Sequence, residues 1–536
     1  MLFRSACIIL TALLIVVSPL LVKNVNESFL LRKQRRVSEL FYAVEGAVDD
    51  GIDQFVDAVA NFTVSATTSR WPAAGTLSTN YTASTAFPAG VAVSWYVDDE
   101  GSLQQTVTDP DGTQVLVKTF VVHANGIHPD DASVTLTMHQ LVRCRLIYTF
   151  QHAVFYNDDL EILPGPDMNF AGRIHSNEDI YMDSHNTLTV DSEYLRCAGD
   201  IYNYRKDNGA ALGGDVDIRV AGTTNYAVMN GLDSDDGNWM TESQTRWNGT
   251  VQTGDHGVTP LSVPVVGSVQ PGGYYHTNAD VVVINDVITQ GGVTLTEGVD
   301  IPAGTIVTDT DFYNNRESRY VRMTNIDMRR LAGYAPGDPD GSPSFPDHLP
   351  ANGLMYATRD DAPAGQQPGI RLTNGERIYR TGGVTVVSND PVYIQGDFNT
   401  DQRQPSSVIC DAINILSNNW NDSTSTLGLG NRIANETMVN LAFISGIDTT
   451  TAGNYNGGLE NYPRFHENWS GVTFNITGAF VELWNSQIAQ GQWNYGSPQY
   501  TAPRRDWSYD TSFGLNNMPP FTPWAVSAEK GAWWTD

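Results

Sequence analysis

Acidic loops are the part of this sequence whose residue types come closest to a metal site. They occur at residues 157–159 (NDD), 233–237 (DSDDG) and 338–341 (DPDG). Calcium takes about six to eight oxygen ligands, which such loops can supply. None of the three has the D-x-[DN]-x-[DN]-G pattern with a distal glutamate. Acidic loops are also typical of tight turns with solvated carboxylates, so we expect no cofactor and keep calcium as the alternative.

Recurring aspartates could instead serve glycan chemistry. Asp179, Asp200 and Asp397 hold the same place in a motif that reads DIY twice and GDFN far downstream. Two carboxyl groups at a fixed separation can hydrolyse a glycosidic bond. Repeated acids in stacked strands more often fix turns, however. A surface protein that binds or degrades polysaccharide is therefore kept as the alternative function.

No established catalytic signature accompanies these acids. H-E-x-x-H, G-x-S-x-G, Walker A and G-x-G-x-x-G motifs do not occur in the sequence. The ten histidines are dispersed, and the cysteines form no C-x-x-C pair. We expect the cysteines outside the N-terminal apolar run to be small buried residues. They are Cys144, Cys197 and Cys410. We therefore expect a non-enzymatic protein and assign no catalytic, cofactor-binding or metal residues.

The C-terminal part of the sequence is rich in aromatic residues. Eight of the twelve tryptophans lie between positions 420 and 534. Tryptophan and tyrosine suit sugar binding and protein binding alike, because they bury a large area at a low entropic cost. The same composition also suits a cap that closes the end of a β-rich body.

Composition restricts the kind of protein. The chain has 536 residues, of which 41% are hydrophobic and 17% charged, and its net charge is −29. That apolar content can build a sizeable core, so the chain is not disordered as a whole. A charge this negative repels phosphate backbones, which excludes nucleic acid as a partner.

An apolar run at residues 6–22 predicts a single membrane anchor. It contains 17 residues without a charge, which is near the length of a transmembrane helix. No A-x-A-like cleavage site follows it, so we expect the anchor to remain on the protein. The basic residues after the run favour a cytoplasmic location for that side, whereas the acidic, Thr-, Asn- and Gly-rich remainder favours export. We give the composition more weight and expect the body to be periplasmic or extracellular. The predicted anchor residues are Ala6, Cys7, Ile8, Ile9, Leu10, Leu13, Leu14, Ile15, Val16, Val17, Leu20, Leu21 and Val22.

Residues 27–62 show helical periodicity. Apolar residues recur there at steps of three and four, beginning at Val37 and Leu40 and continuing to Val59. This pattern predicts an amphipathic stalk helix. Such a helix can pack on the body, or laterally against copies or partners in the membrane.

The N-terminal region resembles type IV pilus assembly proteins of the PilX type. Those proteins carry an F-Y-x-A-E-A-G-like signature after the membrane helix, and most of it is present here. Two further stretches, at 149–181 and 457–471, resemble the large envelope members of the group. The signature residues are Phe41, Tyr42, Ala43, Glu45 and Gly46.

This resemblance implies a minor pilin-like or K-type pseudopilin-like component. Prepilins have a glycine before the apolar run and a glutamate early in the mature helix. This sequence has no glycine before Gly46 and no acidic residue before Glu27, so we expect either a true start further upstream or anchoring without prepilin processing. The expected partners are the membrane and other pilin-like or envelope assembly proteins, which the N-terminal helix contacts; glycans are a further candidate.

The rest of the chain predicts a mainly β protein. Hairpin signals in residues 63–145 predict a small antiparallel β domain, with Trp95, Val97, Val107, Val115 and Val117 as core candidates. Very short strands at roughly 20-residue spacing in 146–445 predict a right-handed β-helix-like solenoid, with a loop insertion at about 203–275. Residues 446–536 would form the aromatic-rich cap. A sandwich or jelly roll is the alternative fold.

Together these patterns predict a membrane-anchored bacterial envelope protein. Its anchor and stalk are residues 1–62, and the β-rich body would act structurally, in adhesion or in assembly at the cell surface. The function lies in surfaces rather than in a reaction.

Overall fold

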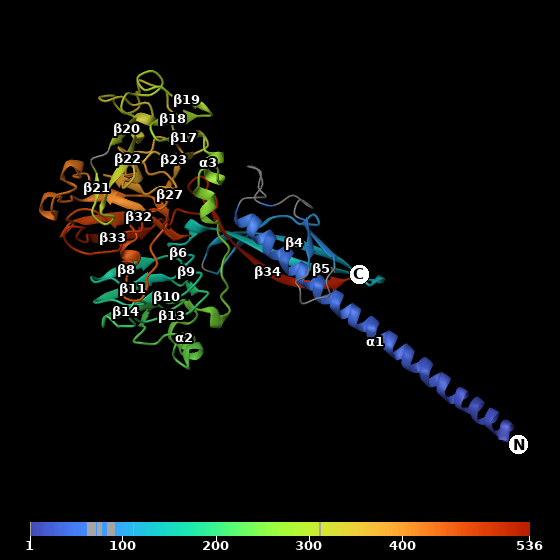
Figure 1. Cartoon of the computed structure of the whole chain (residues 1–536). Coiled ribbons are helices and arrows are strands. Elements are labelled where there is room, and N and C mark those ends of the chain that lie inside the picture. Colours follow the sequence, from blue (N-terminus) through green and yellow to red (C-terminus); the bar gives the residue numbers. More distant parts are fainter. Residues whose placement is uncertain (1, 62–70, 72–77, 83–91, 111, 310–311) are drawn as a thin grey trace. The chain divides into compact units, whose positions relative to one another are not determined.

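The computed structural model describes every residue except 1, 62–70, 72–77, 83–91, 111 and 310–311 (Figure 1). The expected boundary between residues 62 and 63 lies outside the described residues. The chain forms two compact units. Unit 1 comprises residues 1–105, 116–145 and 526–536, and unit 2 comprises residues 106–115 and 146–525.

Unit 1 begins with one long helix, α1, at Leu2–Ala60. It contains both the apolar run and the amphipathic segment that the sequence predicts. Pro19 lies inside α1, where its ring removes one backbone hydrogen bond without ending the helix. At 1.5 Å per residue, 59 residues extend for roughly 90 Å, far more than the thickness of a bilayer.

The rest of unit 1 is built on one β-sheet. Its strand order is β1-β2-β4-β5-β34, with β3 paired to β4. β1 pairs antiparallel with β2, and β2 pairs antiparallel with β4. The last strand comes from the end of the chain, so residues expected in the C-terminal cap complete this sheet. The strands are β1 (Ser78–Thr82), β2 (Ala92–Asp98), β3 (Gln105–Thr108), β4 (Gln114–His128), β5 (Asp131–Tyr148) and β34 (Trp524–Thr535).

Four of the five core candidates from this region are buried. Trp95, Val97, Val115 and Val117 are each at most 5% exposed, whereas Val107 is half-buried. Alternation along β2 explains the pattern, because successive side chains of a strand point to opposite faces.

Unit 2 contains a first series of short strands that stack in parallel. β6, β9 and β12 pair in register, with Val154 beside Ile174 and Ile174 beside Leu195. β7, β10 and β13 form a second row, and β8, β11 and β14 a third. Their bounds are β6 (Val154–Tyr156), β7 (Leu160–Ile162), β8 (Met168–Ala171), β9 (Ile174–Ser176), β10 (Ile180–Met182), β11 (Thr187–Asp191), β12 (Leu195–Cys197), β13 (Ile201–Tyr202), β14 (Asp215–Arg219), β15 (Tyr226–Val228) and β16 (Val251–Gln252).

The two copies of the DIY motif lie directly beside each other in this series. Ile180 pairs with Ile201, and Tyr181 with Tyr202. Ile180, Ile201 and their neighbour Leu160 are completely buried and form one apolar ladder. Burying each such side chain contributes roughly 1.5–3 kcal/mol.

The segment expected as a loop insertion contains strands of this series. β14 pairs in parallel with β11, and β16 pairs in parallel with β12. The nine-residue helix α2 (Trp239–Trp247) lies in the same segment, with Trp239 and Trp247 buried.

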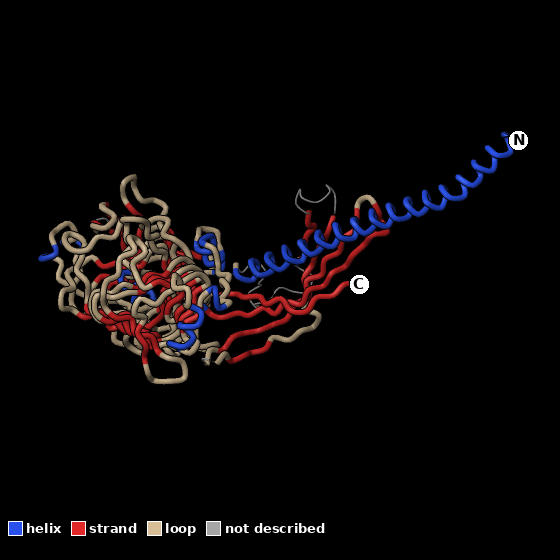
Figure 2. The backbone as a smooth tube through the Cα atoms, turned by 90° about the horizontal axis from the view of Figure 1, so that it is seen from below, coloured by secondary structure: helices blue, strands red, loops and turns tan. Residues whose placement is uncertain are grey.

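A second series of parallel strands follows in the chain. β17, β23, β25, β27, β30 and β32 stack in that order, and β22, β24, β26, β28 and β31 form a neighbouring row. Loops and turns join the short strands (Figure 2). The bounds are β17 (Val281–Ile284), β18 (Val287–Gln290), β19 (Val293–Thr294), β20 (Ile306–Asp309), β21 (Tyr313–Asn314), β22 (Arg319–Asp327), β23 (Leu354–Thr358), β24 (Gln367–Thr373), β25 (Thr385–Val387), β26 (Val392–Gln395), β27 (Ser407–Cys410), β28 (Ile413–Leu416), β29 (Thr437–Val439), β30 (Ala442–Ser445), β31 (Arg464–Phe465), β32 (Thr473–Glu482) and β33 (Arg504–Tyr509), with helices α3 (Tyr274–Asn278) and α4 (Met328–Leu331).

The two series meet where the end of the later series lies beside the start of the earlier one. β32, the last long strand of the second series, pairs in parallel with β6, the first strand of the first series. Unit 2 therefore has one continuous stack that runs from β17 through β32 and β6 to β16. The protein as described is mainly β, with a long N-terminal apolar helix and several sheets.

Candidate functional site

The first half of α1 presents an apolar surface to its surroundings. The anchor side chains from Ile8 to Val22 are 40–69% exposed, and Val25, Phe29 and Leu30 continue the apolar surface. Ala6 and Cys7 lie in the helix, but their side chains are outside the described set. Among the described residues, α1 alone is long and apolar enough to span a membrane. This half of the helix is consistent with a membrane-anchored envelope protein.

The second half of α1 packs on the sheet of unit 1. Leu40, Val44, Val48 and Phe55 are buried there, at the three- and four-residue steps that the sequence predicts. Apolar burial on one face explains why this half of the helix is stable outside a membrane.

Two glycines allow helix and sheet to approach closely. A Cβ at Gly51 would lie 2.8 Å from Val122 Cγ1 and 3.1 Å from the Trp95 ring. A Cβ at Gly126, on β4, would lie 2.7 Å from both Leu40 Cδ1 and Val44 Cγ2. The helix and the sheet therefore each carry a glycine at a point where side chains of the other lie close.

Polar contacts fix the register of α1 on the sheet. The Trp95 indole N–H donates to Asp50 at 2.7 Å, and Arg36 donates to Asp131 at 3.2 Å. His128 lies 3.3 Å from Glu39, whose pKa is lowered mainly by a hydrogen bond from Arg35.

The family-signature residues lie where α1 meets the sheet. Ala43 is buried, Gly46 is half-buried, and Glu45 and Tyr42 are exposed. The ring of Phe41 stacks edge-on against Trp533 of β34 at 6.1 Å.

Charge is segregated along α1. Residues 23–36 contain five basic residues and one acid, whereas residues 39–57 contain six acids and no base. The acids Glu45, Asp49, Asp53 and Asp57 follow one another at four-residue steps and are exposed. Residues four apart share one face of a helix, so they form an acidic row.

The repeated aspartates of unit 2 fix turns. Asp179 N–H donates to Asp159 Oδ1 at 3.0 Å, and Asp200 N–H donates to Asp179 Oδ1 at 2.8 Å. Asp397 serves a separate turn, because its carboxylate accepts from the Met438 N–H at 2.8 Å. The structure thus brings Asp179 and Asp200 together and places Asp397 in the second series.

The other acidic loops are internally hydrogen-bonded. Asp233 accepts from the N–H groups of Asn203 and Asp235, and Asp338 accepts from the N–H groups of Ala335 and Ser344. No group of three or more His, Cys, Asp or Glu that could hold a metal occurs among the described residues.

Histidine and cysteine are mostly buried. Burial lowers the pKa of His175 to about 4 and that of His466 to about 3. Cys144, Cys197 and Cys410 are buried and form no disulfide, and burial raises the pKa of each thiol. Raised pKa values make these thiols poor nucleophiles.

Half of the eight C-terminal tryptophans are buried. Trp420, Trp469, Trp484 and Trp507 are at most 8% exposed, so they belong to the core of unit 2. Trp533 and Trp534 are exposed, and they lie on β34 in unit 1.

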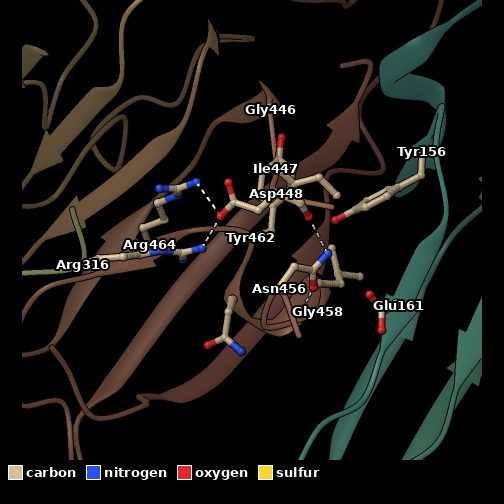
Figure 3. A pocket seen from close by; sticks show the side chains of 12 residues that line it. Tyr156, Glu161, Arg316, Gly446, Ile447, Asp448, Asn456, Gly458, Tyr462 and Arg464 are labelled. Carbon is tan, nitrogen blue, oxygen red and sulfur yellow. Dashed lines mark hydrogen bonds and ion pairs between the residues drawn. The ribbon is translucent and has the colours of Figure 1, made fainter. Parts of the chain in front are cut away.

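A buried cluster of charges surrounds a small cavity in unit 2 (Figure 3). Arg316 and Arg464 both donate to Asp448, at 2.6 and 3.2 Å. Arg464 also donates to Glu317 at 2.8 Å, and its side chain is only 5% exposed. Burial is the largest influence on Arg316 and lowers its pKa to about 10.

Glu161 lines the same cavity from β7. Glu161 is only 2% exposed, and burial raises the pKa of its carboxyl group to about 7. One carboxyl oxygen, Oε2, has no hydrogen-bond partner. The cavity has a volume of about 20 Å³, which is room for one water molecule and not for a sugar ring.

Sequence reasoning missed this cluster. Its members come from positions between 161 and 464, and only strand pairing brings them together. The one available signal was Arg464, a charged residue beside Phe465 in the stretch at 457–471 that the family resemblance had marked.

Comparisons with known proteins give little direct guidance. No model of a known protein family matches the sequence, and no curated protein matches it significantly. A solved structure described as "Crystal structure of competence-associated pilin ComZ from Thermus thermophilus" is similar at 9% identity, covering 94% of this chain and 98% of that one, with a TM-score of 0.25.

Proposed function

We propose that this protein is a membrane-anchored, pilin-like component of the bacterial cell envelope. Its body is periplasmic or extracellular, and it acts in structure, adhesion or assembly rather than in catalysis. The resemblance of the N-terminal signature to PilX-type and pseudopilin-like proteins supports this proposal.

One observation carries the proposal: α1 is divided into two halves with different surroundings. The half up to about residue 31 exposes apolar side chains, and the half from Leu40 is buried on a β-sheet of its own unit. Exposed apolar surface of this size marks a membrane or protein interaction site. A helix built this way anchors its own folded unit and leaves its first half to lipid or to neighbouring helices.

The segregated charge of α1 supports lateral packing. The basic stretch at 23–36 of one helix complements the acidic row Glu45, Asp49, Asp53 and Asp57 of a neighbour displaced along the helix axis. Complementary charges specify register and partner more than they add affinity.

We further infer that the two parallel series of unit 2 are coils of a β-solenoid. Side chains such as Leu160, Ile180 and Ile201 stack in register, and carboxylates such as Asp159 and Asp179 bridge successive turns. A solenoid offers a long, rigid outer surface, which suits a structural or adhesive role.

Site-specific cross-linking in cells tests the helix-based proposal. In a chain with Cys7→Ala, a single cysteine would replace Val25 or Leu30, both exposed on α1. A short bis-maleimide should then give cross-linked dimers or adducts with pilin-like proteins in the membrane fraction. The three remaining native cysteines are buried and should not react.

Thr294→Cys is the matched control, because Thr294 is exposed on β19 of unit 2. It should give no specific adduct. Membrane retention without any adduct from either helix position would show a simple anchor and contradict lateral assembly. Recovery of the full chain from the soluble fraction would contradict the anchor itself.

A further inference from the structure

A groove lies on unit 2 where two of its sheets meet. β33 pairs with β32, and β8 pairs with β11, so β33 and β8 belong to different sheets although they are neighbours (Figure 1). The stack itself is unbroken at this level, because β32 and β6 are paired. The opening beside β33 and β8 has a volume of about 610 Å³ and adjoins a second of about 830 Å³. Ala171 and Ser508 line both, so they form one groove.

The floor of this groove carries rows of hydrogen-bonding side chains. Asn169 of β8 lies beside Thr189 of β11, and Thr187 continues the row along β11. Alternate residues of the same strands, Met168 and Leu188, are buried in the core, so the polar ones face outward. Neighbouring strands are about 4.8 Å apart, so amide and hydroxyl groups recur at close intervals across the groove.

The second part of the groove adds aromatic rings. Tyr194, Tyr509 and Phe513 line it, and the rings of Tyr509 and Phe513 lie 6.3 Å apart. Tyr194 and Tyr509 are half-buried, whereas Phe513 is buried. The Arg173 guanidinium lies over the Tyr194 ring at 3.8 Å, and the Tyr509 hydroxyl donates to the Phe150 carbonyl at 3.0 Å. The exposed parts of the two tyrosine rings can pack against the apolar faces of sugar rings.

Both signs of charge line the groove, with four acids (Asp167, Asp191, Glu193 and Asp506) and three arginines (Arg173, Arg219 and Arg505). Arg219 lies 3.2 Å from Asp191 and 3.3 Å from Glu193, so one guanidinium serves both carboxylates. Arg173 lies 3.8 Å from Asp109. The groove therefore has no excess of basic groups to hold a polyanion, and the chain's net charge of −29 opposes one.

We propose that this groove binds a neutral glycan chain. The joined volumes reach the size of small-molecule and cofactor sites, and the lining combines hydroxyl, amide and aromatic groups without a net cationic patch. The inference concerns binding alone. It is independent of the assembly role proposed for α1.

Titration calorimetry with defined oligosaccharides tests the proposal. The full chain in detergent would be titrated with cellohexaose, chitohexaose and mannohexaose, and with oligogalacturonate as an acidic comparison. We expect at least one neutral hexasaccharide to bind. The double variant Asn169→Leu/Thr189→Leu should raise its Kd about tenfold or more, because it removes two hydrogen-bonding groups from the groove floor.

Thr294→Leu is the matched control, since it makes the same change at an exposed strand position outside the groove. It should bind like the unmodified chain. The circular-dichroism melt of the double variant would verify that unit 2 remains folded. Equal binding by a folded double variant would place the site elsewhere and overturn the proposal. So would binding of oligogalacturonate alone, or of no oligosaccharide.

Discussion

Arg464 holds together the buried charge cluster of unit 2. Its guanidinium is buried between Glu317 and Asp448 and also donates to the Ala489 carbonyl at 2.6 Å. Arg464→Met would leave two carboxylates short of a partner, which costs about 3–5 kcal/mol of unfolding free energy. Denaturant unfolding of unit 2, followed by tryptophan fluorescence, measures this loss. Arg377→Met is the control, because that more exposed arginine lies 3.6–3.8 Å from its carboxylates and should cost less than about 1 kcal/mol.

Adding Glu317→Gln to Arg464→Met should restore part of the lost stability. The second change removes one uncompensated charge, so the two effects are not additive. Full additivity would contradict the pairing.

The sequence did not reveal this cluster, because an isolated arginine or glutamate in a short strand carries no information about which strand lies beside it.

At the scale of elements, the α1–sheet interface should resist any added volume. Gly51→Val places two methyl groups against Val122 and Trp95, and overpacking of this kind costs about 1–3 kcal/mol. Asp53→Val adds the same side chain to an exposed position of the same helix and serves as the control. Limited proteolysis of unit 1 should detect loosening in the first variant alone. Equal resistance of both variants would mean that the helix is not held closely at Gly51.

Elements with a strong local signal were the ones that the sequence could predict. The helix follows from an uninterrupted apolar run and the three- and four-residue steps after it, and the short strands follow from apolar triplets bounded by glycine, proline or asparagine. The sequence did not predict that residues 203–275 contain strands of the first series. Nor did it predict that the last strand, β34, completes the sheet of unit 1. Both depend on which other strand lies beside them: β14 pairs with β11, and β34 pairs with β5.

The molecule as a whole should lose stability on both sides of a middle pH range. Burial raises the pKa of Glu482 to about 8 and those of Glu161, Glu467 and Asp390 to about 7. The folded state therefore holds protons that the unfolded state releases above about pH 4.5, so these acids reduce stability as the pH rises to about 8. Buried histidines act oppositely below about pH 6.5, where only the unfolded state is protonated.

The two contributions oppose each other between about pH 4.5 and 6.5, and only the acids act above that range. We therefore expect the melting temperature of unit 2 to fall between pH 6.5 and 8.5. Differential scanning calorimetry across that range measures the fall. Glu482→Gln should make this fall in melting temperature smaller, because an amide does not release a proton. The amide oxygen can still accept from the N–H groups of Asn157 and Asp158, so the local structure should be kept. An unchanged pH profile in that variant would contradict the assignment to Glu482.

The junction of β6 with β32 has a consequence for synthesis and export. Asn157 donates to Glu482, which follows it by 325 residues, and the strands beside these residues pair edge to edge. The strands from β6 to β16 emerge from the ribosome before those of the second series, yet the strand that pairs with β6 is among the last. Until β32 has been made, the edge of β6 stays unpaired and can pair with the wrong strands. Production of this protein should therefore depend on whatever shields that edge until the chain is nearly complete.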